Sequence, residues 1–415
     1  MSSHGTGVAP PEEPKTSPTP RAARRLSSVS GAQWAGWGGI ALGLLAFYIA
    51  LPPLLLRTPL PSLALALVGA VAGIMAIREG ERRLGWGAVA AAVVGGAGAV
   101  AATLSGEANL ERVAVWSALG AAMLRFATPL TFAALGGVIS ERSGVVNIGL
   151  EGMMLVGAFF GIWGADVTGS WVGGLAVAMV AGGMLALIHA VFAVSLRADQ
   201  IVSGVAVNLL ALGLTGYLFL DVYGAEGTPG GIAEVPDLNL PIGWIPVVGG
   251  SLERLNLLVW LSLLGVLVVW IVIFRTALGL RLRSVGENPR AAETVGISVY
   301  RARYLAVVAS GMLAAMGGAF LSIGFVHSFS QNMTAGRGYI ALAAVIFGRW
   351  RPGGALAAAL LFGFSSALAQ RLPVFSPSTA TLFQALPYVL TLIAVAGVIG
   401  RSTPPAADGV PYTRG

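Results

Sequence analysis

LNLLVWLSLLGVLVVWIVIF, residues 255–274, is a run of twenty residues without a charged side chain. An α-helix needs about 20 predominantly apolar residues to cross the hydrocarbon core of a bilayer. Ten further runs of roughly that length occur along the chain, and one shorter run, 338–348, is about half as long. The other long runs are 34–56, 59–77, 84–104, 116–140, 153–169, 171–196, 201–224, 304–324, 354–371 and 381–400. The pattern predicts an all-α, polytopic transmembrane helical bundle of roughly 10–12 membrane segments, with room for broken or re-entrant helices.

The composition supports the same class. Of 415 residues, 56% are hydrophobic and only 10% are charged, whereas soluble domains carry about 25% charged residues. The 58 glycines follow no collagen period and suit membrane helices that pack closely through small residues. Cysteine is absent and histidine occurs three times, which leaves no thiolate or histidine-based metal site. A soluble enzyme, a collagen and a disordered chain are excluded.

The basic residues predict the orientation. If the N-terminus is inside and every run changes sides, nineteen basic residues lie on the inside and five on the outside. Cytoplasmic loops carry an excess of Lys and Arg. We therefore expect a multi-pass protein of the plasma (inner) membrane with both termini cytoplasmic. The loop 225–254 is then outside, and the arginine-rich loop 275–303 is inside.

This inside loop contains the stretch GLRLRSVGENPRAAETVGI, residues 279–297. Asn288 is a good N-cap, Pro289 suits the first helical position, and Gly296 suits a C-terminal stop. The sequence predicts a helix of about two turns from Pro289 to Val295. It is either an amphipathic surface helix anchored by arginines or a docking helix that passes force to a cytoplasmic partner.

Three stretches resemble the ABC importer permeases of the branched-chain amino acid, sugar and nucleoside group. They are residues 279–297, TPLTFAALGGVISERSGVVNIGLEGMMLVGAFFG at 128–161, and GRGYIALAAVIFGRWRPGGA at 336–355. The form ISERSGVVNIGLEGMML is most similar to the nucleoside-type permeases. The resemblance extends over roughly 116–400.

The resemblance implies a permease subunit that works by alternating access. Its partners are a second homologous permease chain, ABC ATPase subunits and an external substrate-binding lipoprotein. The residues that it assigns to ATPase coupling are Arg283, Gly286, Glu287, Asn288, Pro289, Arg290, Ala292, Glu293 and Gly296. The chain has no G-x-x-x-x-G-K-[ST] phosphate loop. We therefore expect no cofactor on this chain, with ATP and Mg used by the partner ATPase.

The composition, the apolar runs and the resemblance together divide the chain into regions. They are a disordered cytoplasmic tail at 1–33, three additional N-terminal transmembrane helices at 34–104, a permease core at 105–402, and a cytoplasmic tail at 403–415. The core resemblance does not cover the three additional helices, and their role stays open.

Polar residues interrupt the apolar pattern between Glu141 and Glu151. This segment is either a short cytoplasmic turn or a broken helix whose polar groups line a substrate cavity. Irregular backbone at membrane depth requires protein or water to satisfy it. We favour the broken helix, with Asn147 and Glu151 as substrate-pathway residues.

Further pathway candidates lie within the runs. Asn208 could read a nucleobase edge, and Phe159, Phe160 and Tyr217 could stack a purine. Each has a structural alternative, namely an interhelical hydrogen bond for the asparagine and packing or lipid contact for the aromatic rings. We expect His189 to be an interhelical hydrogen-bonder.

No Ser/His/Asp grouping or carboxylate pair lies in a common membrane run, so we expect no catalytic residues and no enzyme activity. Two alternatives to a nucleoside importer remain. One is an ABC permease for simple sugars or branched-chain amino acids. The other is an ion-coupled secondary transporter, which would leave the Asn288–Gly296 helix without a purpose.

Overall fold

The computed structural model describes residues 31–49, 58–104, 116–243, 248–371 and 403–413. These residues are mostly helical, and a two-stranded antiparallel sheet pairs β1 (Asp237–Asn239) with β2 (Arg254–Asn256). Eight helices of the described ranges are long and apolar enough to cross a membrane. The expected all-α, polytopic bundle is therefore confirmed.

Two of the predicted apolar runs do not form a long helix among the described residues. The short run 338–348 forms α14 (Arg337–Phe347), an apolar helix of 11 residues. The run 381–400 lies outside the described residues. The number of crossings over the whole chain therefore stays a prediction.

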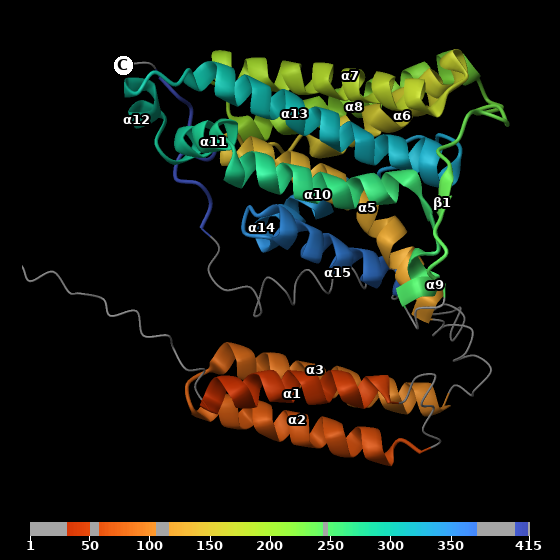
Figure 1. The fold of residues 1–415 in the computed structure, drawn as a ribbon, viewed down its shortest axis with the longest axis vertical. Coiled ribbons are helices and arrows are strands. Elements are labelled where there is room, and N and C mark those ends of the chain that lie inside the picture. The colour runs from red at the N-terminus through yellow and green to blue at the C-terminus, as the bar shows by residue number, and fades with distance from the viewer. Residues whose placement is uncertain (1–30, 50–57, 105–115, 244–247, 372–402, 414–415) are drawn as a thin grey trace, which may run out of the picture.

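The N-terminal helices form a group of their own (Figure 1). They are α1 (Gly31–Tyr48), α2 (Leu60–Arg78) and α3 (Arg82–Leu104). Small residues let their backbones approach, because a Cβ added to Gly69 would lie 2.9 Å from the Gly39 carbonyl oxygen. The large side chains point outward instead. Helix α1 begins at Gly31, two residues before the end of the segment assigned to the tail.

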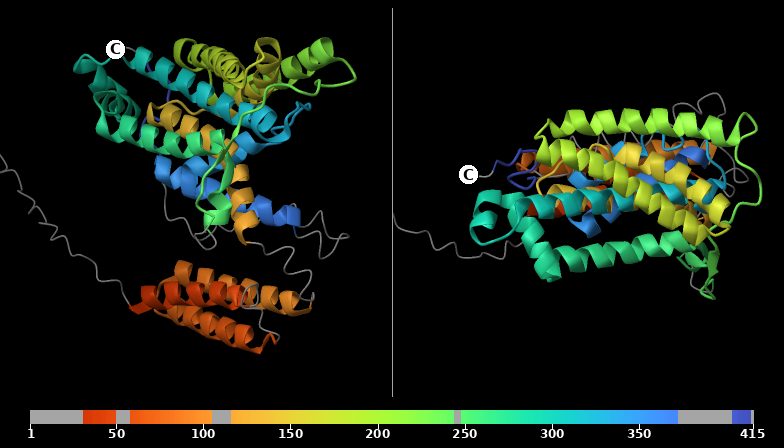
Figure 2. Two further views of the ribbon diagram at one scale, coloured as in Figure 1. Left: turned by 45° about the vertical axis from the view of Figure 1, so that its right-hand side comes forward. Right: turned by 90° about the horizontal axis from the view of Figure 1, so that it is seen from above.

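The remaining long helices run roughly side by side in one body (Figures 1 and 2). Helices α6 and α13 are the most deeply buried, and α5, α6 and α7 lie against α13. The helices are α5 (Trp116–Arg142), α6 (Leu150–Thr168), α7 (Trp171–Ala190) with the π-helical η1 (Val191–Ser195), α8 (Gln200–Tyr223), α10 (Leu257–Arg275), α13 (Val299–Ala319) with the π-helical η2 (Phe320–Val326), and α15 (Pro352–Arg371).

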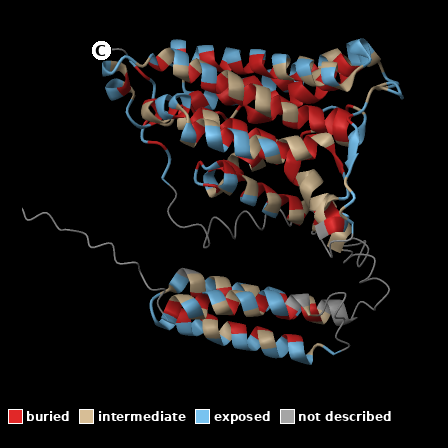
Figure 3. Ribbon diagram, in the orientation of Figure 1, coloured by how far each residue is buried: buried red, intermediate tan, exposed pale blue. Residues whose placement is uncertain are grey.

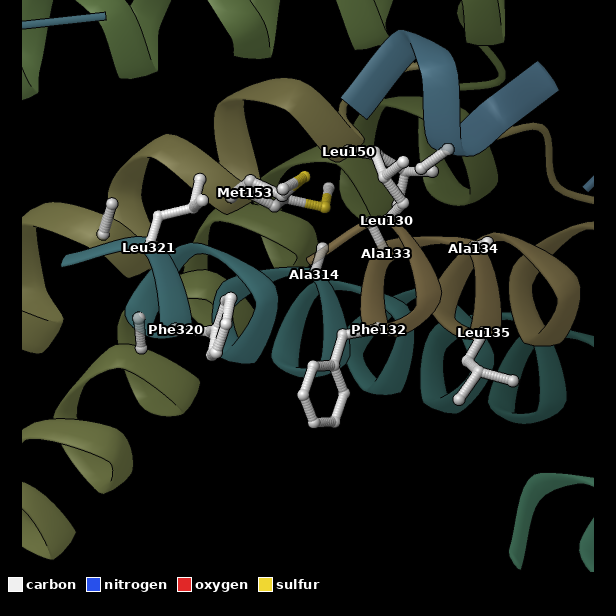
Figure 4. Packing of buried hydrophobic residues seen from close by; sticks show 14 of the residues in the cluster. Leu130, Phe132, Ala133, Ala134, Leu135, Leu150, Met153, Ala314, Phe320 and Leu321 are labelled. Carbon is white, nitrogen blue, oxygen red and sulfur yellow. The ribbon is translucent and has the colours of Figure 1, made fainter. Parts of the chain in front are cut away.

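The core of this body is built from apolar side chains of α5, α6, α13 and η2, which Figure 4 shows from close by. Phe132 and Leu135 of α5 and Phe320 of η2 are at most 1% exposed. Buried residues concentrate between these helices, whereas outer faces are exposed (Figure 3). Exposed Leu, Ile and Val on α8 and α10 suit contact with lipid, since a membrane helix gains nothing by hiding them.

Short elements close the two ends of the body. At one end, β1, β2 and α9 (Val248–Leu252) belong to the predicted outside loop. There the Asn256 side-chain amide donates to the carbonyls of Val235 and Gly324, 3.0 and 3.1 Å away, and ties this loop to η2. At the other end lie α11 (Ala277–Glu287) and α12 (Pro289–Thr294), beside the C-terminus (Figure 1).

Candidate functional site at the break between α5 and α6

The break between α5 and α6 is a buried, non-helical segment. Helix α5 ends at Arg142, α6 begins at Leu150, and most residues between them are buried. Within the segment, the Ser140 hydroxyl donates to the Val145 carbonyl at 2.7 Å, and Gly144 has φ +84°. The Ser140 side chain thus pairs with a backbone carbonyl that has no partner in a helix, and Gly144 permits the left-handed turn of the chain.

The residues that flank the break hold the two ends of α14. The length of α14 is therefore a measure of the length of the break. At the C-terminal end of α14, the Trp350 indole donates to the Glu141 carboxylate, and Arg142 Nε donates to the Trp350 carbonyl at 2.9 Å. The N-terminal end is held by Glu151. Eleven helical residues rise about 16 Å, about half a membrane crossing. The break therefore runs along a half-length helix and is not an exposed turn.

Glu151 is the main polar contact of the N-terminal end of α14. Its Oε1 accepts hydrogen bonds from the Thr334 hydroxyl at 2.6 Å and the Gly336 amide at 2.8 Å. Its Oε2 accepts from the Gly338 amide at 2.6 Å. A carboxylate suits these donors because the N-terminus of a helix carries positive partial charge. A Cβ at Gly338 would lie 2.8 Å from Glu151 Oε2, so this contact requires glycine there.

Asn208 holds the other side of the break. Its Oδ1 accepts from the Gly152 amide at 2.7 Å, and its Nδ2 donates to the Ile148 carbonyl at 3.0 Å and the Tyr339 hydroxyl at 3.1 Å. The side chain is 7% exposed. These contacts correspond to the structural alternative for Asn208, an interhelical hydrogen bond, since the side chain connects α8 to α6, α14 and the break.

Asn147 lies within the break and is fully buried. Its Nδ2 donates to the Ser310 hydroxyl of α13 at 2.9 Å. Among the described residues, no hydrogen-bond donor reaches its Oδ1. An unpaired buried amide oxygen is costly, so this atom is free to accept a hydrogen bond from water or from a ligand.

His189 also supports the break. Its Nε2 lies 3.2 Å from the Val146 carbonyl and its Nδ1 lies 3.1 Å from the Ser203 hydroxyl. The Val146 amide donates to Gln200 Oε1 at 2.7 Å. His189 is thus the interhelical hydrogen-bonder that we expected.

The predicted aromatic residues lie elsewhere. Phe159 is 1% exposed and meets Phe160 and Phe329 edge to face at 5.2 and 5.4 Å. Phe160 lines an apolar groove of about 510 Å³ between α6, α7 and α8. Tyr217 is 66% exposed on α8. The structure does not gather these rings around Asn147, and a stacking role for them stays a prediction.

Several contacts of the break were missed at the level of sequence, namely those of Gln200, Ser203, Ser310, Thr334, Tyr339 and Trp350. One usable signal was present. TAGRGY, residues 334–339, places small and polar residues directly before a short apolar run, as expected for a helix N-terminus that receives a carboxylate.

The segment assigned to coupling lies at the end of the body that carries α12. The Asn288 side chain caps α12 by accepting from the Ala291 amide at 3.1 Å, and Gly296 has φ +85°. The predicted helix thus forms, one residue shorter than expected. Gly286 packs on the Arg142 carbonyl, and the Arg283 guanidinium lies 5.3 Å from the Phe274 ring. Arg290 is exposed and Ala292 is buried.

Two acidic residues of this segment differ from expectation. Glu287 and Glu293 were assigned to ATPase coupling, with no contact expected within the chain. Instead, Glu287 Oε2 accepts from the Ala406 amide at 3.3 Å, and the Glu293 carboxylate accepts from the Tyr412 hydroxyl. Both therefore contact the C-terminal segment, which the sequence places 119 residues away.

Within the described ranges, no group of three His, Asp or Glu side chains is placed to hold a metal ion. At the break, two buried acceptor atoms, Glu141 Oε1 and Asn147 Oδ1, have no hydrogen-bond partner among the described residues. These groups suit hydrogen bonding to a polar, uncharged ligand.

Comparison with known proteins matches residues 119–395 to the family described as branched-chain amino acid transport system, permease component. The guanosine ABC transporter permease protein NupQ of Bacillus subtilis is 43% identical over 324 residues, which cover 74% of this chain and 99% of NupQ. The nucleoside ABC transporter permease protein NupC of Lactococcus lactis is 42% identical over 304 residues, 70% of this chain and 95% of NupC.

The putative glucose ABC transporter permease protein TsgC13 of Haloferax volcanii is 42% identical over 255 residues, 60% of this chain and 76% of TsgC13. Bacillus subtilis and Lactococcus lactis each have a second such permease protein, NupP and NupB, at 27% and 26% identity to this chain. No solved structure matches.

Proposed function

Since this chain belongs to the family of branched-chain amino acid transport system permease components, we propose that it is the membrane-spanning permease subunit of an ABC importer for nucleosides. The observation that carries the proposal is the likeness to NupQ and NupC over 99% and 95% of their lengths at more than 40% identity. NupQ is named for guanosine and NupC for nucleosides. The eight long apolar helices of the described residues suit a membrane-spanning permease.

We propose that the chain pairs with a second, related permease. NupQ and NupP of Bacillus subtilis are both guanosine permease proteins, and this chain is 43% identical to one and 27% to the other. NupC and NupB differ in the same way, at 42% and 26%. A pair of distinct chains is supported by this repeated difference.

The remaining partners follow from the same proposal. ATPase subunits would dock on the cytoplasmic face around α12 and use ATP and Mg, and an external lipoprotein would deliver the nucleoside. The exposed Arg290 and the 73% exposed Val295 offer the ATPase one charged and one apolar contact. The positive-inside asymmetry supports cytoplasmic termini and an inner-membrane location.

We assign the substrate path to the break. Asn147 Oδ1 is an open acceptor within the break and suits an N–H or hydroxyl of a nucleoside. Glu151 and Asn208 have their oxygens bonded to backbone, so they position the path and do not bind substrate. Alternating access would require α14 to move together with these contacts.

Uptake in a host that lacks its own nucleoside transport tests the proposal. The chain is expressed with its neighbouring ATPase, second permease and lipoprotein, and uptake of labelled guanosine is measured against unlabelled uridine, glucose and leucine. We expect nucleosides to compete. Asn147→Ala should raise the half-saturating guanosine concentration about tenfold, the effect of a lost polar contact of about 1.4 kcal/mol. Asn332→Ala, in the loop before α14, is the matched control.

A sugar importer is the second candidate, because TsgC13 is as similar in identity over a shorter length. If glucose competes and guanosine does not, the nucleoside assignment is wrong. If neither uptake depends on the ATPase, the chain is an ion-coupled carrier and the ABC assignment is wrong.

A further inference from the structure

Residues 403–413, here called the C-terminal strap, fold onto the segment that carries α12 (Figure 1). A turn opens the strap, with the Asp408 amide donating to the Pro405 carbonyl at 3.0 Å and the Val410 amide to the Ala407 carbonyl at 3.2 Å. The sequence predicts only a cytoplasmic tail here. The strap instead contacts α11, α12, α13 and the break.

The first set of contacts joins the strap to α11 and α12. The Ala407 amide donates to the Gly286 carbonyl at 2.8 Å, and the Ala406 amide donates to the Glu287 carboxylate. Tyr412 donates its hydroxyl to Glu293 of α12. Two of these three bonds end on the last two residues of α11 and one ends on α12, so the strap contacts both helices across the junction between them.

The Tyr412 ring adds an apolar anchor. It is 5% exposed and forms a small separate cluster with Val285, Ala292 and Val299. The ring also meets Tyr300 edge to face, with centroids 5.8 Å apart. Three helices, α11, α12 and α13, thus share one side chain of the strap.

The second set of contacts joins the strap to the core. Arg303 of α13 is fully buried, and its Nη1 donates to the Val410 carbonyl at 3.1 Å. Its guanidinium also attracts the Asp408 carboxyl. The Ala407 carbonyl oxygen would lie 3.0 Å from a Cβ on Gly144, so the strap rests directly on the break.

We propose that the C-terminal strap is a mechanical link that carries displacement of α12 to α13 and to the break between α5 and α6. Tyr412 of the strap positions it against Glu293 of α12, and Asp408 of the strap positions it against Arg303 of α13. The inference rests on the proposed function, because it needs ATPase subunits that move α12. A loose tail would not bury a tyrosine against α12 and occupy a buried arginine of α13.

The test uses the whole complex, with its ATPase, second permease and lipoprotein, in proteoliposomes. Guanosine uptake and ATP hydrolysis are measured together. For Tyr412→Ala we expect basal ATP hydrolysis to persist, while guanosine transported per ATP hydrolysed falls about tenfold, a coupling loss of the size that elements remote from both sites carry. Tyr412→Phe keeps the ring and should show a smaller loss. Val410→Ala, which trims an exposed strap side chain, is the control.

A cross-link provides the second arm. The chain has no cysteine, so Glu287→Cys with Ala406→Cys, both at exposed positions, can be joined by a short bifunctional thiol reagent. Glu287 is the last residue of α11, two residues before α12. If the strap moves together with this α11–α12 junction, the joined complex transports at the rate of the same double variant before joining. If joining abolishes transport, the strap is a latch that must release, and the proposal is wrong.

The remaining outcomes are also decisive. Normal transport per ATP in both Tyr412→Ala and a chain ending at Ser402 overturns the link. Failure of Tyr412→Ala to assemble with the ATPase makes the strap a docking element and also overturns it. If the parent complex transports glucose and not guanosine, the nucleoside assignment fails, and the same ratio is then measured with glucose.

Discussion

The N-terminal bundle α1–α3 and the body that begins at α5 are both made of long apolar helices, but they bury different side chains. Among the described residues of α1–α3 the buried positions are Ala, Gly and Ser62, and a polar contact joins Gln33 to Glu81 at 3.0 Å. The body buries Glu141, Glu151 and Arg303 as well as several amides. Close backbone contact is sufficient to hold regular helices together in a membrane.

The difference in buried side chains follows the position of non-helical backbone, which lies in the body. Buried ionisable groups are costly in a membrane protein and persist where they satisfy other groups. Glu151 serves the first turn of a half-length helix, and Arg303 serves a strap carbonyl. The buried polar side chains therefore mark the parts of the chain that helix packing alone cannot hold, and these are the parts assigned to transport.

Removing Glu151 should have the largest effect. Glu151→Ala leaves the Thr334 hydroxyl and two backbone amides without their acceptor, at about 1–3 kcal/mol for each unsatisfied donor. We expect unfolding free energy to fall by about 3 kcal/mol or more, whereas Gln33→Ala in the bundle should cost at most about 1 kcal/mol. Thermal unfolding in detergent measures both. Equal losses would remove the distinction between the two regions, and exposed Glu226→Ala is the control.

Glycine substitutions should separate the regions by function. A Cβ on Gly318 would collide with the Met154 carbonyl between α13 and α6, and one on Gly95 would collide with the Gly43 carbonyl between α3 and α1. Overpacking costs about 1–3 kcal/mol in either place. Gly318→Ala should lower guanosine uptake severalfold, and Gly95→Ala should leave it nearly unchanged at equal membrane levels. Gly213→Ala meets open space and serves as the control.

A loss of uptake in Gly95→Ala as large as in Gly318→Ala would mean that the bundle takes part in transport. That outcome would place a function in α1–α3, outside the matched family range of 119–395.

The sequence predicts local features better than distant contacts. The α12 helix follows from Asn288, Pro289 and Gly296, which lie within nine residues, because capping is a local property. The break was visible as polar residues between two apolar runs. Its partner at Gly338 lies 187 residues from Glu151, and no local pattern indicates that pairing.

The strap was missed for the same reason. TPPAADGVPYT, residues 403–413, is rich in proline and small residues and predicts a tail. Its order depends on Tyr412 reaching a pocket between α11, α12 and α13. Likewise, Arg303 was counted as a positive charge of the inside loop, whereas it lies fully buried in α13, where its Nη1 donates to the Val410 carbonyl of the strap.

A change of pH should alter the stability of the body more than that of the bundle. The effect should be smaller than that of the substitutions above. Burial raises the pKa of Asp408 to about 7 from an ordinary value of 3.8, against the lowering effects of the Arg303 guanidinium and the Gly409 amide. The Glu141 carboxyl also interacts electrostatically with the Asp408 carboxyl. The folded chain then keeps a proton that the unfolded chain releases, so this contribution to stability is full below about pH 4 and is lost as pH rises to about 7.

The thermal midpoint should therefore fall between pH 5 and pH 8 by more in the parent than in Asp408→Asn, which cannot ionise. In the bundle, Glu79 is exposed and Glu81 half-buried, so Glu79→Gln should leave the pH dependence as it is. A parent and an Asp408→Asn variant with the same pH dependence would show that Asp408 is already ionised in the strap.

The two chain ends give the smallest expected effect. Residues 1–30 lie outside the described residues, and their low hydrophobicity and many Pro and Ser residues predict a segment that cannot repay the entropy of ordering. Helix α1 begins at Gly31, so a chain that starts at Gly31 after an initiating Met keeps every described bundle contact. Guanosine uptake and membrane level should equal those of the parent, whereas removal of 403–415 should uncouple transport from ATP hydrolysis. If deletion of 1–30 lowers uptake at an unchanged membrane level, the N-terminal segment has a role that its composition does not indicate, and the contrast between a dispensable end and a docked end fails.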